Sequence, residues 1–199
     1  PRSSTMSKIL VAYATNAGST AEVAAAVAET LTQTGHAAAA LPMDQVNDLS
    51  AYDAVVAGAP MIFGWQAAAR RFVRRNQAEL SCKKVAYFAC AMRLTRVPGE
   101  VLPAVQLTLD PNLTAEPAKP GSLSLKERFT TLSYYLKPMV AAAPRVQPVD
   151  VAFFGGSLDM RKLKWWQAAF VMVVVQATPG DYRDWDAIRA WAKALAKGL

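Results

Sequence analysis

Apolar residues gather in four runs that contain few polar positions. The runs cover residues 8–15, 54–60, 84–90 and 150–158. A run without apolar–polar alternation is typical of a strand that is buried on both faces of a parallel sheet. Residues 36–43 predict a further strand of weaker character, because the alanines at its centre lack β-branching. The pattern therefore predicts five strands.

Segments of helical periodicity lie between these runs and after the last one. Residues 21–34 predict a helix that ends at Gly35, and residues 67–77 predict a second helix. Residues 185–196 predict a third helix, with Asp184 as its N-cap. The positions expected to face the core are Val23, Val27, Leu31, Phe72, Val73, Trp185, Ile188, Trp191, Ala192 and Leu195.

Strands that alternate with helices predict an α/β fold, an open parallel sheet with helices on both faces. We expect the strand order 2-1-3-4-5 within a single domain of residues 6–199, and interpret residues 1–5 as a cloning remnant before Met6. Residues 97–148 form a long insertion after the fourth strand, because they hold eight of the 12 prolines. Within the insertion only residues 126–136 predict a helix, and we expect part of it to be mobile.

Charge and composition narrow the choice of partner. The formal net charge is +7 and the sequence pI is about 9.6, which argues for an anionic partner. Cys82 and Cys90 make no disulfide framework. Neither a signal peptide nor a bilayer-spanning apolar run is visible, so the cytoplasm is the expected compartment. The exposed face of the second helix is expected to carry Arg70, Arg71, Arg74 and Arg75.

A short polar loop separates the first strand from the first helix. Its sequence is Thr15-Asn16-Ala17-Gly18-Ser19-Thr20. Such a loop places free backbone N–H groups and a helix N-terminus at the carboxyl end of a strand, where phosphate binds without a positive side chain. The loop is not a P-loop, and it lacks the three glycines of the dinucleotide fingerprint. The alternative is an ordinary strand-to-helix turn with Ser19 or Thr20 as N-cap.

Two further loops are expected at the same edge of the sheet, because ligands of open α/β sheets bind at the carboxyl ends of the strands. They are residues 61–65 and residues 91–93. Met61, Phe63, Trp65 and Met92 offer flat or soft apolar side chains that can hold a tricyclic ring between them. For each aromatic taken alone, packing in the core is the simpler interpretation.

The loop pattern Thr15-x-x-Gly18-x-Thr20 resembles the FMN-phosphate loop of flavodoxins. The resemblance implies a flavodoxin-like fold with FMN as cofactor, its phosphate held by the hydroxyls and amides of this loop. Ala17 departs from the family, which usually has a hydroxyl or a carboxylate at that position. One hydrogen bond to phosphate is therefore missing, a loss of roughly 0.5–1.5 kcal/mol.

The C-terminal part is similar to one branch of that family, the menaquinone-dependent protoporphyrinogen IX oxidases. The similar stretches are residues 153–158, the basic-aromatic stretch around Lys164-Trp165-Trp166, and Arg183-Asp184-Trp185. The resemblance implies an FMN that accepts reducing equivalents from a porphyrinogen and passes them to a membrane quinone. Residues 97–148 exceed the insertion of that branch, so the resemblance specifies the flavodoxin family better than the substrate.

The leading hypothesis is an FMN-dependent oxidoreductase whose chemistry takes place on the flavin, with no catalytic side chain and no metal. A chain with one histidine offers no credible Ser/His/Asp arrangement, and no metal-ligand spacing is present. The residues predicted to bind FMN are Thr15, Asn16, Ala17, Gly18, Ser19, Thr20, Pro60, Met61, Ile62, Phe63, Gly64, Cys90, Ala91 and Met92.

The predicted partners are a quinone or a porphyrinogen-like small molecule, and no nucleic acid. Basic residues, a tryptophan pair and an apolar run in residues 161–175 favour peripheral contact with an anionic membrane; the alternative is a segment docked on the sheet with its lysines solvated. Two alternative functions stay open. One is a flavodoxin that carries electrons to a protein partner, and the other is a flavodoxin-fold interaction module that has lost FMN.

Overall fold

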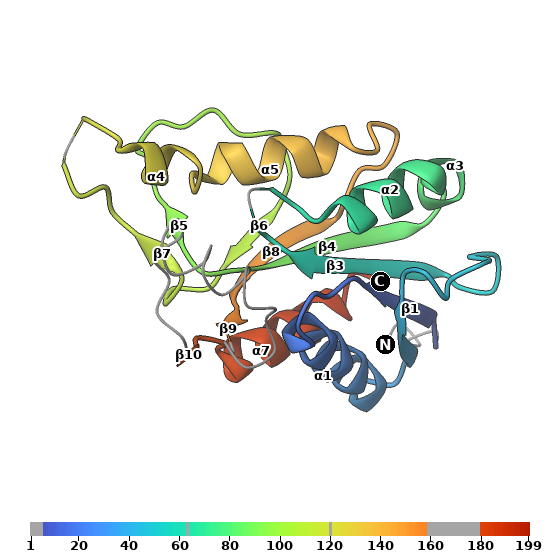
Figure 1. Cartoon of the computed structure of the whole chain (residues 1–199). Coiled ribbons are helices and arrows are strands. Elements are labelled where there is room, and N and C mark those ends of the chain that lie inside the picture. The colour runs from blue at the N-terminus through green and yellow to red at the C-terminus, as the bar shows by residue number, and fades with distance from the viewer. Residues whose placement is uncertain (1–5, 63, 120, 159–179) are drawn as a thin grey trace.

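The computed structural model describes residues 6–62, 64–119, 121–158 and 180–199. At its centre lies a six-stranded sheet with the order β2-β1-β3-β4-β8-β6, in which all neighbours are parallel (Figure 1). Its first five strands are the predicted five, in the predicted order. The bounds are β1 Lys8–Tyr13, β2 Ala37–Pro42, β3 Ala54–Pro60, β4 Lys84–Ala91, β6 Leu107–Leu109 and β8 Asp150–Gly155.

The strand register brings the carboxyl ends of the central strands to one edge of the sheet. Tyr13 of β1 lies opposite Gly58 of β3, and Pro60 of β3 lies opposite Cys90 of β4. Because the strands are parallel, the segments that follow β1, β3 and β4 leave the sheet on the same side. The three loops predicted to form a site therefore begin at a common edge.

Helices cover both faces of the sheet, as predicted. One face carries α1 (Ser19–Gln33) and α7 (Trp185–Leu195), and the other carries α2 (Ala67–Arg75), α3 (Gln77–Leu80) and α5 (Leu132–Ala141) (Figure 1). The predicted second helix thus ends two residues early, and α3 follows it as a separate turn. None of the helices in the described ranges is long and apolar enough to cross a membrane.

The α1/α7 face is packed around aromatic rings. Phe154 lies 6.3 Å from Phe88 and 5.4 Å from Trp191, measured between ring centroids. Asp184 caps α7, as predicted, by accepting hydrogen bonds from the backbone N–H groups of Asp186 and Ala187. All helix positions predicted to face the core are buried except Trp185, which is half-buried.

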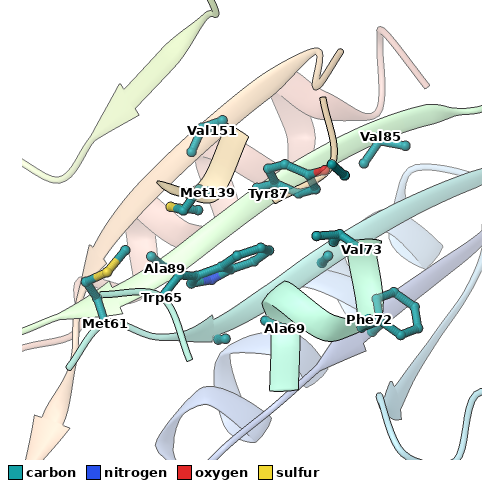
Figure 2. Close-up of a cluster of buried hydrophobic side chains, with 14 of the residues drawn as sticks. Met61, Trp65, Ala69, Phe72, Val73, Val85, Tyr87, Ala89, Met139 and Val151 are labelled. Atoms are coloured by element: carbon teal, nitrogen blue, oxygen red, sulfur yellow. The ribbon is translucent and has the colours of Figure 1, made fainter. Parts of the chain in front are cut away.

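The opposite face is packed around Trp65 and Tyr87, whose ring centroids lie 5.2 Å apart (Figure 2). Phe72 and Val73 of α2 and Met139 of α5 belong to the same buried cluster. This cluster joins the end of the second predicted loop to the sheet and to two helices. The loop that follows β3 therefore ends in the packed core.

The insertion corrects two predictions. Residues 126–136 do not form one helix. The first of them belong to α4 (Leu125–Arg128), and α5 begins after Thr131. Thr131 Oγ1 accepts a hydrogen bond from Tyr134 N at 3.3 Å. An N-cap inside the periodic segment divides the helix. The sheet also has six strands instead of the predicted five, because β6, which comes from the insertion, pairs with β8 at the sheet edge. The insertion thus supplies an edge strand and a core helix.

Small elements complete the C-terminal half. They are two pairs of two-residue strands, β5 (Leu94–Thr95) with β7 (Thr114–Ala115), and β9 (Ser157–Leu158) with β10 (Gly180–Asp181). The first pair lies within or beside the insertion and ties it to the end of β4. The second pair brings the chain from β8 to α7.

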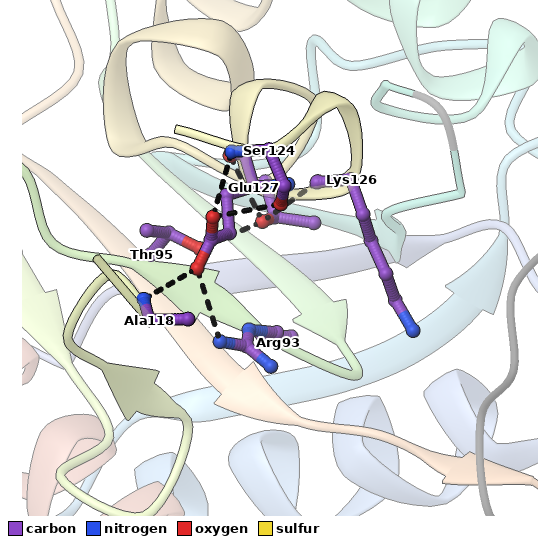
Figure 3. Close-up of polar contacts among 7 residues, drawn as sticks. Arg93, Thr95, Ala118, Ser124, Lys126 and Glu127 are labelled. Carbon is purple, nitrogen blue, oxygen red and sulfur yellow. Dashed lines mark hydrogen bonds and ion pairs between the residues drawn. The ribbon is translucent and has the colours of Figure 1, made fainter. Parts of the chain in front are cut away.

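A buried carboxylate holds the insertion together (Figure 3). Glu127 accepts hydrogen bonds from Ala118 N at 2.7 Å, from Ser124 N at 2.8 Å and from Ser124 Oγ at 2.7 Å. Arg93, just after β4, approaches the same carboxylate at 3.9 Å. The hydrogen bonds, that of Ala118 first, lower the pKa of Glu127 to about 2. The carboxylate is therefore ionised at neutral pH and joins Ala118 and the start of α4 to Arg93 at the end of β4.

Candidate functional site

The first loop forms a glycine turn that leaves the start of α1 uncapped. Gly18 is the N-cap residue, with φ of 92°, and no side chain caps the helix. Gly18 N donates to Thr15 Oγ1 at 2.9 Å, which closes the turn. The alternative with Ser19 or Thr20 as N-cap is therefore wrong. An uncapped helix start presents free N–H groups and the positive end of the helix dipole, which favour an anion.

The hydroxyls of this loop differ in their surroundings. Thr15 and Ser19 are half-buried and Asn16 is exposed, while Thr20 is fully buried. Among the described residues no other side chain or backbone group is within hydrogen-bond geometry of Thr20 Oγ1, but the buried Cys90 thiol is close enough to interact with it. The Thr20 hydroxyl therefore belongs to the core beside Cys90. Ala17 is half-buried and adds no side-chain donor.

The second loop is anchored to β4 by its backbone. Met61 N donates to Cys90 O at 2.8 Å, and Ile62 N donates to Gly64 O at 3.1 Å. Gly64 has φ of 116°, which only glycine adopts readily. Ile62 is 56% exposed, so it presents an apolar side chain at the surface of the loop. Phe63 lies outside the described residues.

The side chains of Met61 and Trp65 fill the core instead of the loop surface. Met61 is 4% exposed and Trp65 is 1% exposed, and both belong to the cluster of Figure 2. The core interpretation therefore holds for Trp65. A ring bound at this edge would meet Ile62 and the loop backbone rather than these two side chains.

The third loop lies beside the segment that follows β8. Cys90 and Ala91 are buried, and Met92 is half-buried. Gly156 N donates to Ala91 O at 2.8 Å, and a Cβ on Gly156 would lie 3.4 Å from Met92 Sδ. Burial raises the pKa of the Cys90 thiol to about 12, so the thiol is protonated at neutral pH. Cys90 is therefore a packing residue and not a nucleophile.

A cleft of about 330 Å³ opens between the first and second loops. Gln66 Nε2 donates to Asn16 Oδ1 and so joins the two loops. The residues that line the cleft are Asn16, Pro60, Ile62, Gly64, Trp65, Gln66, Ala67 and Arg70. Four of them, Asn16, Pro60, Ile62 and Gly64, were predicted to bind the cofactor.

Gln66 and Arg70 were missed because no motif marks them. Gln66 is the N-cap of α2 and Arg70 lies in its first turn, and only the tertiary fold shows that both line a cleft with Asn16. The sequence offers one indication for Arg70, its position in the helix turn that directly follows the second loop. Arg70 is exposed, as expected for the basic face of this helix.

Arg183 ties the chain after β10 to the start of α1. Its guanidinium contacts Asp181 at 2.6 and 2.7 Å and Glu22 at 2.8 Å, and lies 4.5 Å from the ring centroid of Trp185. The hydrogen bonds that Arg183 donates to Asp181 and Glu22, that to Asp181 first, raise the pKa of Arg183 further above its ordinary value. Because two carboxylates neutralise it, Arg183 fixes the start of α1 and offers no free charge to a ligand.

A second cavity, of about 440 Å³, lies between α7 and the amino end of β8. Asp150 is 4% exposed there and accepts hydrogen bonds from Trp191 Nε1 and Thr108 Oγ1, both at 3.2 Å. Both carboxylate oxygens thus have partners within the protein. No group of three His, Cys, Asp or Glu side chains placed to hold a metal exists among the described residues.

The chain is similar to known flavodoxins. A family described as "Flavodoxin domain" matches residues 10–184. A short-chain flavodoxin associated with a PDU bacterial microcompartment superposes with a TM-score of 0.52 at 11% identity, covering 97% of this chain and 99% of that one. A flavodoxin of Streptococcus pneumonia TIGR4 gives 0.51 at 9% identity, covering 96% and 99%. At such identities the structural likeness shows the fold alone.

One similar structure is much longer. Rubredoxin oxygen:oxidoreductase from Desulfovibrio gigas aligns with 96% of this chain at 12% identity and a TM-score of 0.49, and this chain spans 35% of its length. No curated protein sequence matches this chain.

Proposed function

The chain belongs to the flavodoxin domain family, and on this premise we propose that it is an FMN-dependent electron-transfer protein with oxidoreductase activity. Family membership supports FMN as the cofactor. The observation that carries the proposal is the meeting of an uncapped helix start, two anchored loops and a cleft at the carboxyl edge of the sheet. This is the edge at which open α/β sheets bind ligands.

The residues of this edge fit the chemistry of FMN. Residues 15–20 would hold the phosphate through backbone N–H groups and the hydroxyls of Thr15 and Ser19. Ile62 and Met92 offer apolar surface for the ring. When bound, FMN supplies the electron-transfer chemistry, while the protein positions it and shields it from water.

For the substrate, we propose a porphyrinogen-like donor and a quinone acceptor. The support is sequence resemblance in residues 153–158 and 183–185, together with the net charge of +7, which suits a substrate that carries propionates. The segment of residues 161–175, on which the membrane hypothesis rests, lies outside the described residues.

A specific observation favours electron transfer to a protein as a second candidate. Ile62 is 56% exposed beside the cleft, and Arg70, Arg71, Arg74 and Arg75 on α2 are all exposed. An apolar side chain bordered by basic residues is a docking surface for an acidic redox partner. The two candidates differ in whether a small molecule or a protein reoxidises the flavin.

The experiment is a visible absorption spectrum of the purified protein, with FMN added if it is colourless, followed by anaerobic reduction and exposure to acceptors. We expect a flavin spectrum and fast reoxidation by a water-soluble naphthoquinone. Reoxidation by an acidic redox protein, and not by the quinone, would favour the second candidate. If the protein binds no FMN, both candidate functions are contradicted, and the alternative of a flavodoxin-fold interaction module without FMN is favoured.

A further inference from the structure

The start of α2 lies at the cleft between the first and second loops, and the loop that leads into α1 lines the same cleft through Asn16. Gly18 begins α1 and Gln66 begins the nine-residue α2, and neither helix has a side-chain cap. The hydrogen bond from Gln66 to Asn16 holds the two starts together. The uncapped start of α2 therefore borders the cleft and is tied to the loop before α1, and an uncapped helix start favours an anion.

Polar atoms in the wall of the cleft have no partner among the described residues. Trp65 is 1% exposed and lines the cleft, yet its Nε1–H finds no acceptor. Gln66 Oε1 is likewise buried and unpartnered. The indole N–H of Trp65 can only donate and lies on a side chain packed against Tyr87 in the core, whereas Gln66 Oε1 can only accept. The wall of the cleft therefore holds one buried acceptor, Gln66 Oε1, that has no partner among the described residues.

Arg70 adds a free positive charge to this cleft. It lies in the first turn of α2, and no carboxylate among the described residues pairs with it. Its neighbour Arg71 is also exposed but does not line the cleft. Arg75, on the same helix, donates instead to Val46 O at 2.9 Å. Arg70 is therefore the arginine of α2 whose donors are available at the cleft.

We propose that Arg70 binds the phosphate of FMN across this cleft and compensates for the hydroxyl that Ala17 does not supply. The proposal rests on the proposed function, since it names a ligand of the same site. A guanidinium forms charge-assisted hydrogen bonds with phosphate oxygens, which are stronger than bonds from a neutral hydroxyl. Arg70 and Asn16 both line the cleft, and Asn16 belongs to the loop of residues 15–20 that we propose to hold the phosphate.

The test compares FMN with riboflavin, which lacks only the phosphate, by flavin fluorescence titration at low ionic strength. For Arg70→Gln we expect about tenfold or greater weakening of FMN binding and unchanged riboflavin binding. Arg71→Gln is the matched control, because it removes the same charge from the adjacent position, and it should change neither affinity by more than about twofold. Added salt should reduce the difference between Arg70→Gln and the parent.

The outcomes separate this inference from the proposed function. If Arg70→Gln weakens FMN and riboflavin equally, or leaves FMN binding unchanged, Arg70 is not a phosphate ligand. If Arg71→Gln weakens FMN as much as Arg70→Gln does, the effect is general surface charge and the inference is overturned. If the parent protein binds neither flavin, the proposed function itself fails. Equal unfolding temperatures of the three proteins without flavin will show that the variants are folded.

Discussion

At the scale of single residues, the shape of the loop of residues 15–20 depends on one hydroxyl and one glycine. Thr15 Oγ1 accepts the hydrogen bond of Gly18 N, and Gly18 has a φ of 92° that places the start of α1. The small polar residues that predicted the loop are those that allow this geometry. Ala17 and the buried Thr20 make the hydroxyl set poorer than the sequence pattern indicates.

Replacing Thr15 with alanine tests the loop hydroxyl. Thr15→Ala removes the acceptor of Gly18 N and one hydroxyl near the phosphate, so we expect FMN to bind up to about tenfold more weakly. Thr15→Ser keeps the hydroxyl and should bind like the parent. Fluorescence titration of FMN measures both, and equal affinity for all three proteins would remove Thr15 from the site.

Gly58 in β3 is required for packing rather than for a turn. A Cβ at Gly58 would overlap the ring of Phe88, which is fully buried beside Phe154 and Trp191. We expect Gly58→Ala to lower the free energy of unfolding by about 1–3 kcal/mol. Gly198→Ala, whose Cβ would meet its nearest atom at 3.7 Å, is the control. Urea unfolding measures the stability of both variants, and equal unfolding midpoints would contradict the overlap expected between a Cβ at Gly58 and the Phe88 ring.

At the scale of elements, the insertion contributes to the core of the protein. Leu136 and Met139 of α5 are fully buried, and β6 adds to the sheet edge. Deleting residues 97–148 would therefore damage the fold. The Glu127 network can be altered without removing any core element.

Glu127→Gln should destabilise the insertion and change its response to acid. The pKa of Glu127 is lowered in the folded protein, from 4.5 to about 2, so its contribution to stability is present above about pH 4.5 and is lost as pH falls toward 2. The variant should unfold at a lower temperature at pH 7, with a difference from the parent that shrinks below pH 4. Glu116→Gln, at an exposed position of the insertion, is the control. A pH-independent difference would contradict this role.

An element can be predicted from the sequence when it depends on local residue patterns, and not when it depends on tertiary contacts. The five long strands and three of the helices depend on local apolar patterns, so their positions and order were predictable. The three-residue β6 depends on pairing with β8, and the division of the predicted helix depends on the Thr131 cap overriding its periodicity. The loops of the site were predictable from strand ends, whereas Gln66 and Arg70 join it only through the packing of α2.

At the scale of the whole molecule, the protein is basic, which suits the anionic cofactor that we propose for the cleft. The net charge is +7, and the uncapped start of α2 borders the cleft. Positive charge over the molecule speeds the approach of anionic ligands and is screened by salt. The cofactor and an acidic substrate would both benefit from it.

FMN should stabilise the folded protein as a whole. A ligand that binds only the folded state at a hundred times its Kd adds about 2.7 kcal/mol to the free energy of unfolding. We expect the thermal midpoint to rise with FMN concentration and to rise less with riboflavin at equal concentration. A midpoint independent of both flavins would contradict binding to the folded state.

The most direct test of the central claim is a fluorescence titration of FMN with the flavin-free protein and with Gly18→Val. A side chain at Gly18 would be strained at its φ of 92° and would obstruct approach to the loop backbone. We predict that the parent quenches FMN with a Kd of about 1 μM or tighter, equivalent to roughly −8 kcal/mol, and that a folded Gly18→Val protein does not. No quenching by the parent, or equal binding by both proteins, would contradict a flavin site at this edge.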